Sequence, residues 1–304
     1  MKIEIDKPLE VSHEEENKLA MHSLYNVTGV IITILEFLRG ILEDKRCLEK
    51  SVSLCNSILY SFGDAERTLG TIKNMENYKN IIRDDVKEAI GDSPHVLQQK
   101  LIHELLGNLD NVFNVLDVRV REILARLTAH DSWFLFSIKD LKKNIRNVLA
   151  AIAKNSMGRY GIVYDAQQQG SNDYLVELCI ESHDVETILM PAILQDCFRD
   201  IIANARKYTL PGGKIKASLI DDGSQIVIMV SDTGRGIPAN EIANVVDYGR
   251  RGTNTLERET HGGGFGLTKA YYVCKQFKGR MWIDSDLGKG TTVTLCIPHA
   301  YTSS

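Results

Sequence analysis

The sequence predicts an α+β protein in two parts: an α-helical bundle over residues 1–130, and a domain over 137–304 with helices on one face of a mixed sheet. Three observations support this division. The length of 304 residues suits two domains. From His13 to Ala129 the apolar residues recur every three or four positions, with Pro94 as the single proline. In the second part, β-branched residues alternate with polar ones and glycines mark the turns.

Charge and hydropathy narrow the possible functions. The 36 Lys and Arg against 40 Asp and Glu give a net charge of −4, which excludes nucleic-acid or anionic-membrane binding as the main activity. A membrane-spanning helix needs about 18 consecutive apolar residues. The best candidate, Val27 to Leu38, is shorter and contains Glu36, and the N-terminus has no signal-peptide pattern. The sequence therefore predicts a soluble, cytoplasmic protein without a membrane segment.

The first part is predicted to contain two long helices with an insertion between them. Ser12 or His13 begins the first helix, which has acidic residues in its first turn. The last helix carries an unbroken apolar stripe. An additional helical insertion occupies about 46–92. The predicted helices cover about residues 13–43, 44–62, 63–90 and 94–127.

The second part mixes helices and strands without the regular alternation of a doubly wound parallel sheet. A sandwich with helices on one face of a mixed sheet fits this order better. Asp221 to Gly223 form a hairpin-like turn between two strand candidates. The predicted helices are 139–154, 191–207 and 265–277, and the predicted strands are 174–181, 214–220, 225–231, 280–285 and 291–298.

Four polar or glycine-rich segments follow one another in the second part. Each alone is a weak signal, because glycine pairs are common in turns. Together, in this order and spacing, they closely resemble the N, G1, G2 and G3 boxes of the gyrase, chaperone, histidine-kinase and mismatch-repair (GHKL) ATPase superfamily. The resemblance covers roughly Ile138 to Pro298. The four segments are 200–209, 232–238, 262–267 and 288–292.

The residue types in these segments suit a nucleotide with a bound metal ion. Asp200 and Asn204 are four residues apart, so they share a helix face and can present two oxygens to Mg²⁺. Lys207 follows on nearly the same face and suits a phosphate oxygen. Asp232 ends an apolar strand, where its carboxylate can accept the exocyclic amine of adenine, which guanine lacks.

The glycines have two predicted tasks. Gly234 and Gly236 let the backbone approach the base where a Cβ would collide. The glycines of 262–266 expose backbone N–H groups just before a helix begins. Such amides, together with the helix dipole, form an anion site.

The resemblance implies that ATP and Mg²⁺ bind here and that residues 247–261 form a mobile lid; the alternative is a plain surface loop. Tyr248 lies where histidine kinases usually have phenylalanines. Asp200 lies where they more often have Asn, and where gyrase-like members have the Glu that activates water. Asp200 therefore has two candidate roles, metal ligand or base, and its short reach favours the first. The implied nucleotide-binding residues are Asp200, Asn204, Lys207, Tyr208, Asp232, Gly234, Gly236, Ile237, Arg250, Arg251, Gly262, Gly263, Gly264, Phe265, Gly266, Leu267, Thr291 and Thr292, with Asp200 and Asn204 as metal ligands.

His22 is the candidate phosphoacceptor. It is followed by Asn26 four residues later and then by an apolar run, which resembles the phosphoacceptor box of histidine kinases. Helical spacing directs His22 away from the apolar seam and toward solvent, where Asn26 could orient the imidazole. Ser23 replaces the usual acidic neighbour, so autophosphorylation is expected to be slow. His103 has an acidic neighbour but lies too close to the second part to leave room for an acceptor hairpin. Either histidine could instead be an ordinary surface residue.

The leading interpretation is a histidine-kinase core that transfers the γ-phosphoryl group of ATP to His22 and then to an aspartate of a response regulator. Two alternatives keep the ATP site: a serine kinase resembling pyruvate dehydrogenase kinases, and a nucleotide-switched binding protein without kinase activity. The resemblance also implies a homodimer through the helical bundle. The insertion at 46–92 could instead close the bundle within one chain.

Overall fold

The structure is a computed structural model that describes residues 1–8, 11–43, 46–91, 99–128, 133–154, 156, 158–250, 253 and 265–299. The chain divides into two compact units. One consists of Val11–Ala129, and the other combines Met1–Glu10 with His130–Ser304. The prediction of a single helical part over residues 1–130 is therefore wrong for the first ten residues.

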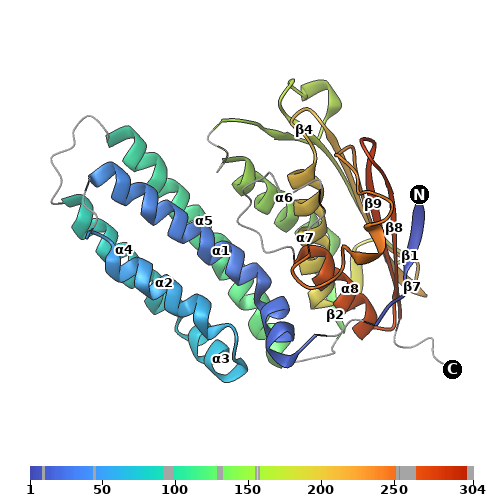
Figure 1. Cartoon of the computed structure of the whole chain (residues 1–304), viewed down its shortest axis with the longest axis horizontal. Coiled ribbons are helices and arrows are strands. Elements are labelled where there is room, and N and C mark those ends of the chain that lie inside the picture. Colours follow the sequence, from blue (N-terminus) through green and yellow to red (C-terminus); the bar gives the residue numbers. More distant parts are fainter. Residues whose placement is uncertain are drawn as a thin grey trace. The chain divides into compact units, whose positions relative to one another are not determined.

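The helical unit contains the predicted long helices and the insertion between them (Figure 1). The first helix begins with a capping box. The Ser12 hydroxyl accepts the backbone N–H of Glu15 at 3.3 Å, and the Glu15 carboxylate accepts the backbone N–H of Ser12 at 2.8 Å. The helices are α1 (His13–Leu42), α2 (Glu49–Ser61), α3 (Ala65–Lys73), α4 (Met75–Gly91) and α5 (Gln99–Thr128).

The insertion packs into the same core as the two long helices. Cys55 of α2 and Ile82 of α4 share one buried cluster with Leu35 of α1 and Leu109 of α5. Helix α2 begins at Glu49 rather than near residue 44. The described helices of one chain thus bury their apolar stripes against one another, as the alternative to a dimeric bundle requires.

Helix α1 is more hydrophobic than the sequence analysis allowed. Its segment Asn17–Leu42 is long and apolar enough to cross a membrane, with a mean hydropathy of 1.4, so the prediction that no segment reaches this level is wrong. The core helix of a soluble protein passes the same test. Leu24, Leu35 and Leu38 are fully buried members of the unit's core, which accounts for part of this apolar character.

The second unit is a seven-stranded mixed sheet, among the described residues, with the order β1-β8-β9-β7-β6-β4-β3. Strands β3, β4 and β6 run parallel, and the remaining neighbours are antiparallel. Strands β2 and β5 form a separate antiparallel pair. The elements are β1 (Lys2–Ile5), β2 (Trp133–Ser137), α6 (Ile138–Lys154), β3 (Ile162–Val163), β4 (Tyr174–Ser182), β5 (Thr187–Pro191), α7 (Ala192–Tyr208), β6 (Lys214–Asp221), β7 (Gln225–Asp232), α8 (Gly266–Gln276), β8 (Arg280–Asp286) and β9 (Gly290–Pro298).

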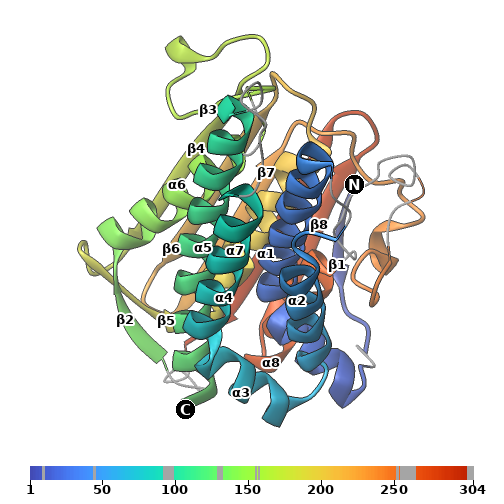
Figure 2. The ribbon, with the colours of Figure 1, turned by 90° about the vertical axis from the view of Figure 1, so that its left-hand side faces the viewer.

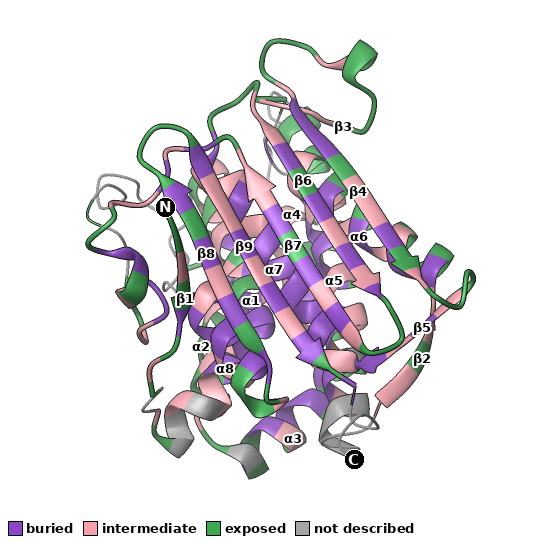
Figure 3. Cartoon of the chain, turned by 90° about the vertical axis from the view of Figure 1, so that its right-hand side faces the viewer, coloured by how far each residue is buried: buried purple, intermediate pink, exposed green. Residues whose placement is uncertain are grey.

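Helices α6, α7 and α8 cover one face of this sheet, as the sandwich prediction requires (Figure 3). Alternate residues of β7, Ile226, Ile228 and Val230, are buried against them. This is the period of two expected for a strand with one covered face. The antiparallel register places Asp232, at the end of β7, opposite Ile215 of β6 and Thr291 of β9.

Strand β1 explains why the first ten residues leave the helical unit. It pairs antiparallel with β8 and forms the edge of the sheet beyond it (Figure 2). Ile5 is buried in the sheet's core, and the Glu4 carboxylate accepts two hydrogen bonds from Arg280, at 2.7 and 2.6 Å. The segment leading to α1 is thereby part of the second unit.

Candidate functional site

Described residues of all four predicted segments meet near the C-terminal end of α7. The Tyr208 carbonyl accepts the backbone N–H of Arg235 at 3.3 Å, which joins α7 to the loop after β7. The β7–β9 register brings Thr291 beside Asp232. The third contact joins α7 to the start of α8, where Asn204 lies against Gly266. The structure therefore assembles the described residues of the predicted nucleotide site in one place.

Asp232 lies in a setting suited to recognising a single donor. Its carboxylate accepts the backbone N–H of Gly234 at 2.7 Å. Burial raises the pKa of Asp232 to about 6, against hydrogen bonds from the backbone of Gly234 and Thr291 that lower it. A carboxylate in such surroundings gains from a further donor, which the adenine amine would supply.

The reason for glycine at 234 and 236 differs from the predicted one. A Cβ at Gly234 would lie 2.6 Å from both Asp232 Oδ1 and the Tyr208 carbonyl oxygen. Gly236 has φ +68°, and a Cβ there would lie 2.1 Å from the Asp286 carbonyl oxygen. The protein's own backbone already requires both glycines, so their presence does not depend on a bound base.

Ile237, Thr291 and Thr292 are held by hydroxyl groups of neighbouring strands. Ser285 Oγ accepts the backbone N–H of Ile237 at 2.9 Å and lies 2.8 Å from Thr291 Oγ1. Thr292 Oγ1 donates to Ser231 Oγ at 2.9 Å. Ser285 thus connects the G1 loop with the G3 strand, although it lies outside the four segments that predict the site.

Asn204 fits the predicted role of metal ligand. Its side-chain amide lies so near the start of α8 that a Cβ on Gly266 would come within 2.2 Å of Asn204 Nδ2. An amide oxygen at this point, beside the predicted phosphate-binding turn, is of the ligand type that Mg²⁺ prefers. Lys207 lies nearby on α7, with its ammonium 5.4 Å from the centre of the Tyr208 ring.

Asp200 does not fit the predicted role of metal ligand. Its side chain is buried, and Oδ2 accepts a hydrogen bond from Lys269 Nζ at 2.8 Å. The ammonium of Lys269 compensates the carboxylate charge that a Mg²⁺ ion or a catalytic proton would otherwise engage. Among the described residues, no group of three or more His, Cys, Asp or Glu side chains could hold a metal ion. Of the two metal ligands predicted on α7, Asn204 is therefore the one that remains a candidate.

The predicted lid is described at residues 247–250 and 253. Arg250 pairs with Asp247 at 3.9 Å, and the Thr253 backbone donates to Glu241 at 3.0 Å. The ring of Phe265 packs on the ring of Tyr248. The predicted residues Arg251, Gly262, Gly263 and Gly264 lie outside the described residues. Leu267, the residue after the predicted phosphate contact Gly266, packs against the sheet's core.

The surroundings of His22 differ from the prediction. Asn26 Nδ2 lies 3.4 Å from His22 Nε2, so the expected pairing of the two side chains is present. However, His22 is only 7% exposed, and the predicted solvent access of the imidazole is wrong for this conformation. Ser23 is also buried, while Asn26 is exposed. Phosphoryl transfer to His22 would thus require a conformation in which the ring is uncovered.

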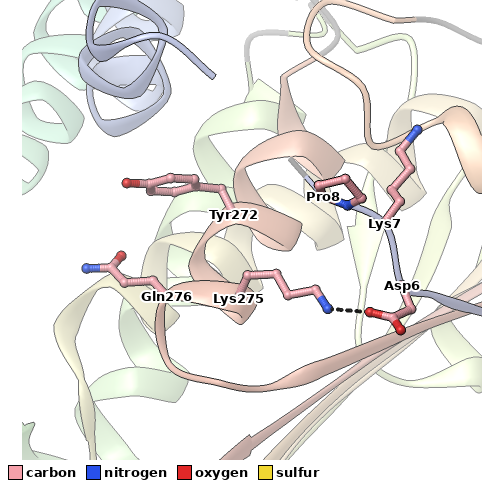
Figure 4. A pocket seen from close by; sticks show the side chains of 6 residues that line it. All are labelled: Asp6, Lys7, Pro8, Tyr272, Lys275 and Gln276. Atoms are coloured by element: carbon pink, nitrogen blue, oxygen red, sulfur yellow. Dashed lines mark hydrogen bonds and ion pairs between the residues drawn. The ribbon is translucent and has the colours of Figure 1, made fainter. Parts of the chain in front are cut away.

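A cavity of about 640 Å³ lies beside α8, away from the predicted nucleotide residues (Figure 4). Asp6 and Lys275 form an ion pair of 2.9 Å across it. Lys7 also pairs with Asp247, and its backbone N–H donates to Tyr271 Oη at 3.0 Å. The segment after β1 is thereby fastened to α8 and to the beginning of the predicted lid. The cavity is lined by Asp6, Lys7, Pro8, Tyr272, Lys275 and Gln276.

Sequence reasoning missed Lys269 and Tyr248 as partners of site residues. A signal for Lys269 existed, because it interrupts an otherwise apolar face of the helix after the phosphate loop. Its partner, however, lies 69 residues earlier. No local pattern connects positions so far apart.

The fold and the assembled site define an ATP-binding domain of the GHKL class. Residues 190–301 match the family described as "Histidine kinase-, DNA gyrase B-, and HSP90-like ATPase". The matched residues include all four of the predicted nucleotide-binding segments.

The similar proteins are sensor kinases. Over 99 residues, 33% of this chain, the sequence is 32% identical to the sensor histidine kinase RppB of Synechocystis sp. and covers 22% of that protein. It is 23% identical to the adaptive-response sensory kinase SasA of Crocosphaera subtropica, over 95% of this chain and 71% of that one. Among solved structures, the mycobacterial sensor histidine kinase MprB matches with a TM-score of 0.40 and 17% identity, covering 54% of this chain and 97% of that one. The chain thus spans about a fifth of the length of RppB.

Proposed function

We propose that the protein is a histidine-kinase core, which transfers the γ-phosphoryl group of Mg²⁺·ATP to His22 and then to an aspartate on a response regulator. One observation carries the proposal: the structure gathers Asn204, Asp232 and Gly266 around the end of α7 within the ATPase domain. The pairing of His22 with Asn26 on α1 supports the choice of acceptor. The sensor-kinase relatives support the reaction class.

Each residue of the site has a defined task in this reaction. Asp232 accepts the adenine amine and orients the base. Asn204 offers an amide oxygen to the metal, and Lys207 offers a cation to a phosphate oxygen. Mg²⁺ would supply charge neutralisation for the transferred group. Phosphoryl transfer depends mainly on such positioning and electrostatic stabilisation.

Incubation with [γ-³²P]ATP tests the proposal. Wild type should acquire acid-labile and base-stable label, as phosphohistidine does, and His22→Ala should acquire none. His103→Ala is the matched control, because His103 is an exposed histidine of the same helical unit, and it should label like wild type. Acid-stable label would support the serine-kinase alternative. Nucleotide binding without any label would support the nucleotide-switched binding protein.

The proposal includes a homodimer and a soluble, cytoplasmic state. Val30 and Phe37, seven residues apart on one face of α1, are 39% and 54% exposed and could be covered by a second copy. Light scattering at micromolar concentration should give twice the 34.1 kDa chain mass. A mass of one chain would favour the self-contained bundle. Fractionation should recover the protein without detergent, because α1 buries its leucines within its own unit.

A further inference from the structure

Four charged side chains are buried together between α7 and α8. Asp196, Arg199 and Asp200 come from α7, and Lys269 comes from α8. Lys269 is 1% exposed and Asp200 is 9% exposed. Two acidic and two basic groups give the cluster no formal net charge. Burial of such groups is tolerated only when each charge has a partner of opposite sign.

Lys269 is the residue that joins the two helices within this cluster. Its Nζ lies 2.8 Å from Asp200 Oδ2 and 3.9 Å from Asp196 Oδ2. Arg199 pairs with Asp196 on the same helix. Removing the ammonium would take this ion pair away from the buried Asp200 carboxylate, while Arg199 would keep its own pair with Asp196.

The ion pair lies one helical turn from the predicted metal and phosphate contacts. Lys269 is three residues after Gly266 on α8, and Asp200 is four residues before Asn204 on α7. Residues at these spacings share a helix face. Helices α7 and α8 therefore touch at two successive levels, Asn204 against Gly266 and Asp200 against Lys269. The ion pair of Asp200 and Lys269 therefore fixes how the two helices are aligned where Asn204 meets Gly266.

We propose that Lys269 is a positioning residue of the nucleotide site. Its ammonium neutralises Asp200 and holds the first turn of α8, where the phosphate-binding segment ends, against the turn of α7 that carries Asn204. In this arrangement Asp200 anchors the helices and Asn204 faces the metal and its nucleotide. The inference rests on the proposed ATP site, because it assigns Lys269 a role only in that site's geometry.

Three variants test this role through nucleotide affinity and thermal stability. Lys269→Met keeps an unbranched side chain one atom shorter and removes the charge. It should lower Tm and weaken Mg²⁺·ADP binding at least ~10-fold, because the buried Asp200 carboxylate loses this ion pair. Lys269→Arg keeps the charge and should bind within ~3-fold of wild type. Asp200→Asn combined with Lys269→Met leaves no unpaired charge, so Tm should recover. Its affinity should stay reduced, since α8 has lost its anchor.

The buried pair of His299 and Asp221, 2.9 Å apart, provides the matched control. It lies at the opposite end of the β6–β7 ladder from Asp232. His299→Phe should lower Tm and leave the Kd for Mg²⁺·ADP within ~2-fold of wild type, because lost stability alone does not alter the site.

The double variant decides the question, and it does so even if Lys269→Met fails to fold. Wild-type affinity together with recovered Tm would overturn the positioning role and leave the pair merely structural. Reduced affinity with recovered Tm supports it. Absence of Mg²⁺·ADP binding in the wild type would instead refute the proposed ATP site.

Discussion

Tyr248 and Phe265 stack with their ring centroids 4.8 Å apart and their planes inclined by 45°. Tyr248 is the second residue of the segment 247–261, which resembles the nucleotide lid, and Phe265 follows that segment by four residues. The Thr268 hydroxyl adds a hydrogen bond of 3.0 Å to the Asp247 carbonyl. The beginning of the lid is thereby joined to Phe265 and to the first turn of α8.

This pairing predicts a specific effect of Tyr248→Ala. Aromatic pairs contribute about 0.5–1.5 kcal/mol beyond burial, which corresponds to a ~2- to 12-fold weaker affinity if the lid covers the nucleotide. Tyr248→Phe keeps the ring contact and should bind as wild type does. Titration of a fluorescent ATP analogue measures both. Equal affinity for Tyr248→Ala and wild type would show that the ring pair does not contribute to nucleotide binding.

The raised pKa of Asp232 predicts a pH-dependent stability. Its pKa is about 6 in the folded protein and 3.8 ordinarily, so the folded state holds the proton more tightly than the unfolded state. The stabilisation from this group is full below about pH 4 and is lost as the pH rises through 6, up to about 3 kcal/mol in all. Asp232→Asn has no carboxyl group that titrates at this position, so it should not lose this stabilisation as the pH rises. Urea unfolding of both proteins without nucleotide at pH 4, 5 and 7.5 measures the difference.

Two observations check the origin of that effect. Asp222 is exposed, and hydrogen bonds from Ser224 and Gln225 lower its pKa, so Asp222→Asn should change the pH dependence in the opposite direction. ATP affinity of the wild type should fall as the pH drops below 6, because the protonated Asp232 is a weaker acceptor. An affinity that is constant between pH 5 and 7.5 would contradict adenine recognition by this carboxylate.

Two glycines predict opposite effects of alanine. A Cβ at Gly266 would lie 2.2 Å from Asn204 Nδ2, whereas a Cβ at Gly29, inside α1, would meet nothing within 4 Å. Gly266→Ala should cost about 1–3 kcal/mol of unfolding free energy and weaken nucleotide binding. Gly29→Ala should stabilise by about 0.5–1 kcal/mol, because Ala favours the helix. Denaturant unfolding of both variants gives the comparison, and a stabilised Gly266→Ala would contradict the close approach.

The burial of Ser23 predicts that an acidic residue directly after His22 would lower the stability of the protein. Its side chain is 3% exposed, and its hydroxyl has no hydrogen-bond partner among the described residues. Ser23→Ala should therefore be neutral or stabilising by up to about 1 kcal/mol. Ser23→Glu would bury a carboxylate and should cost about 3 kcal/mol or more. Thermal unfolding distinguishes the two, and equal Tm values would show that this position opens to solvent.

Strand β1 predicts that the N-terminus stabilises the ATPase unit. Ile5 is buried in the sheet's core, so Ile5→Ala should cost about 2 kcal/mol or more. Lys2→Ala, on the exposed side of the same strand, should change stability by less than about 0.5 kcal/mol. Calorimetry resolves the two variants. Equal stability for Ile5→Ala and Lys2→Ala would mean that β1 adds little to the sheet.

Local patterns predicted the elements whose signals are contained within a few residues. The long helices, the strands β4, β6, β7, β8 and β9, and the helix carrying Asp200 and Asn204 all agree with their periodicity, whereas β5 was not predicted. Strand β1 has four residues and a partner about 280 positions away, so no local pattern predicts it. The burial of His22 and the pairing of Asp200 with Lys269 have the same cause. Each depends on which distant element packs against a helix face. The local spacing of residue types in one sequence does not tell which element that is.

The pairing of β1 with β8 has a consequence for the order in which the protein is built. During synthesis the helical unit emerges complete while the ATPase sheet still lacks its last strands. Strand β1 emerges before the described helices, yet its partner Arg280–Asp286 follows about 280 residues later. Contacts between such distant segments form slowly, because a very long loop must close first. The backbone groups of β1 that pair with β8 therefore stay unpaired until β8 has left the ribosome.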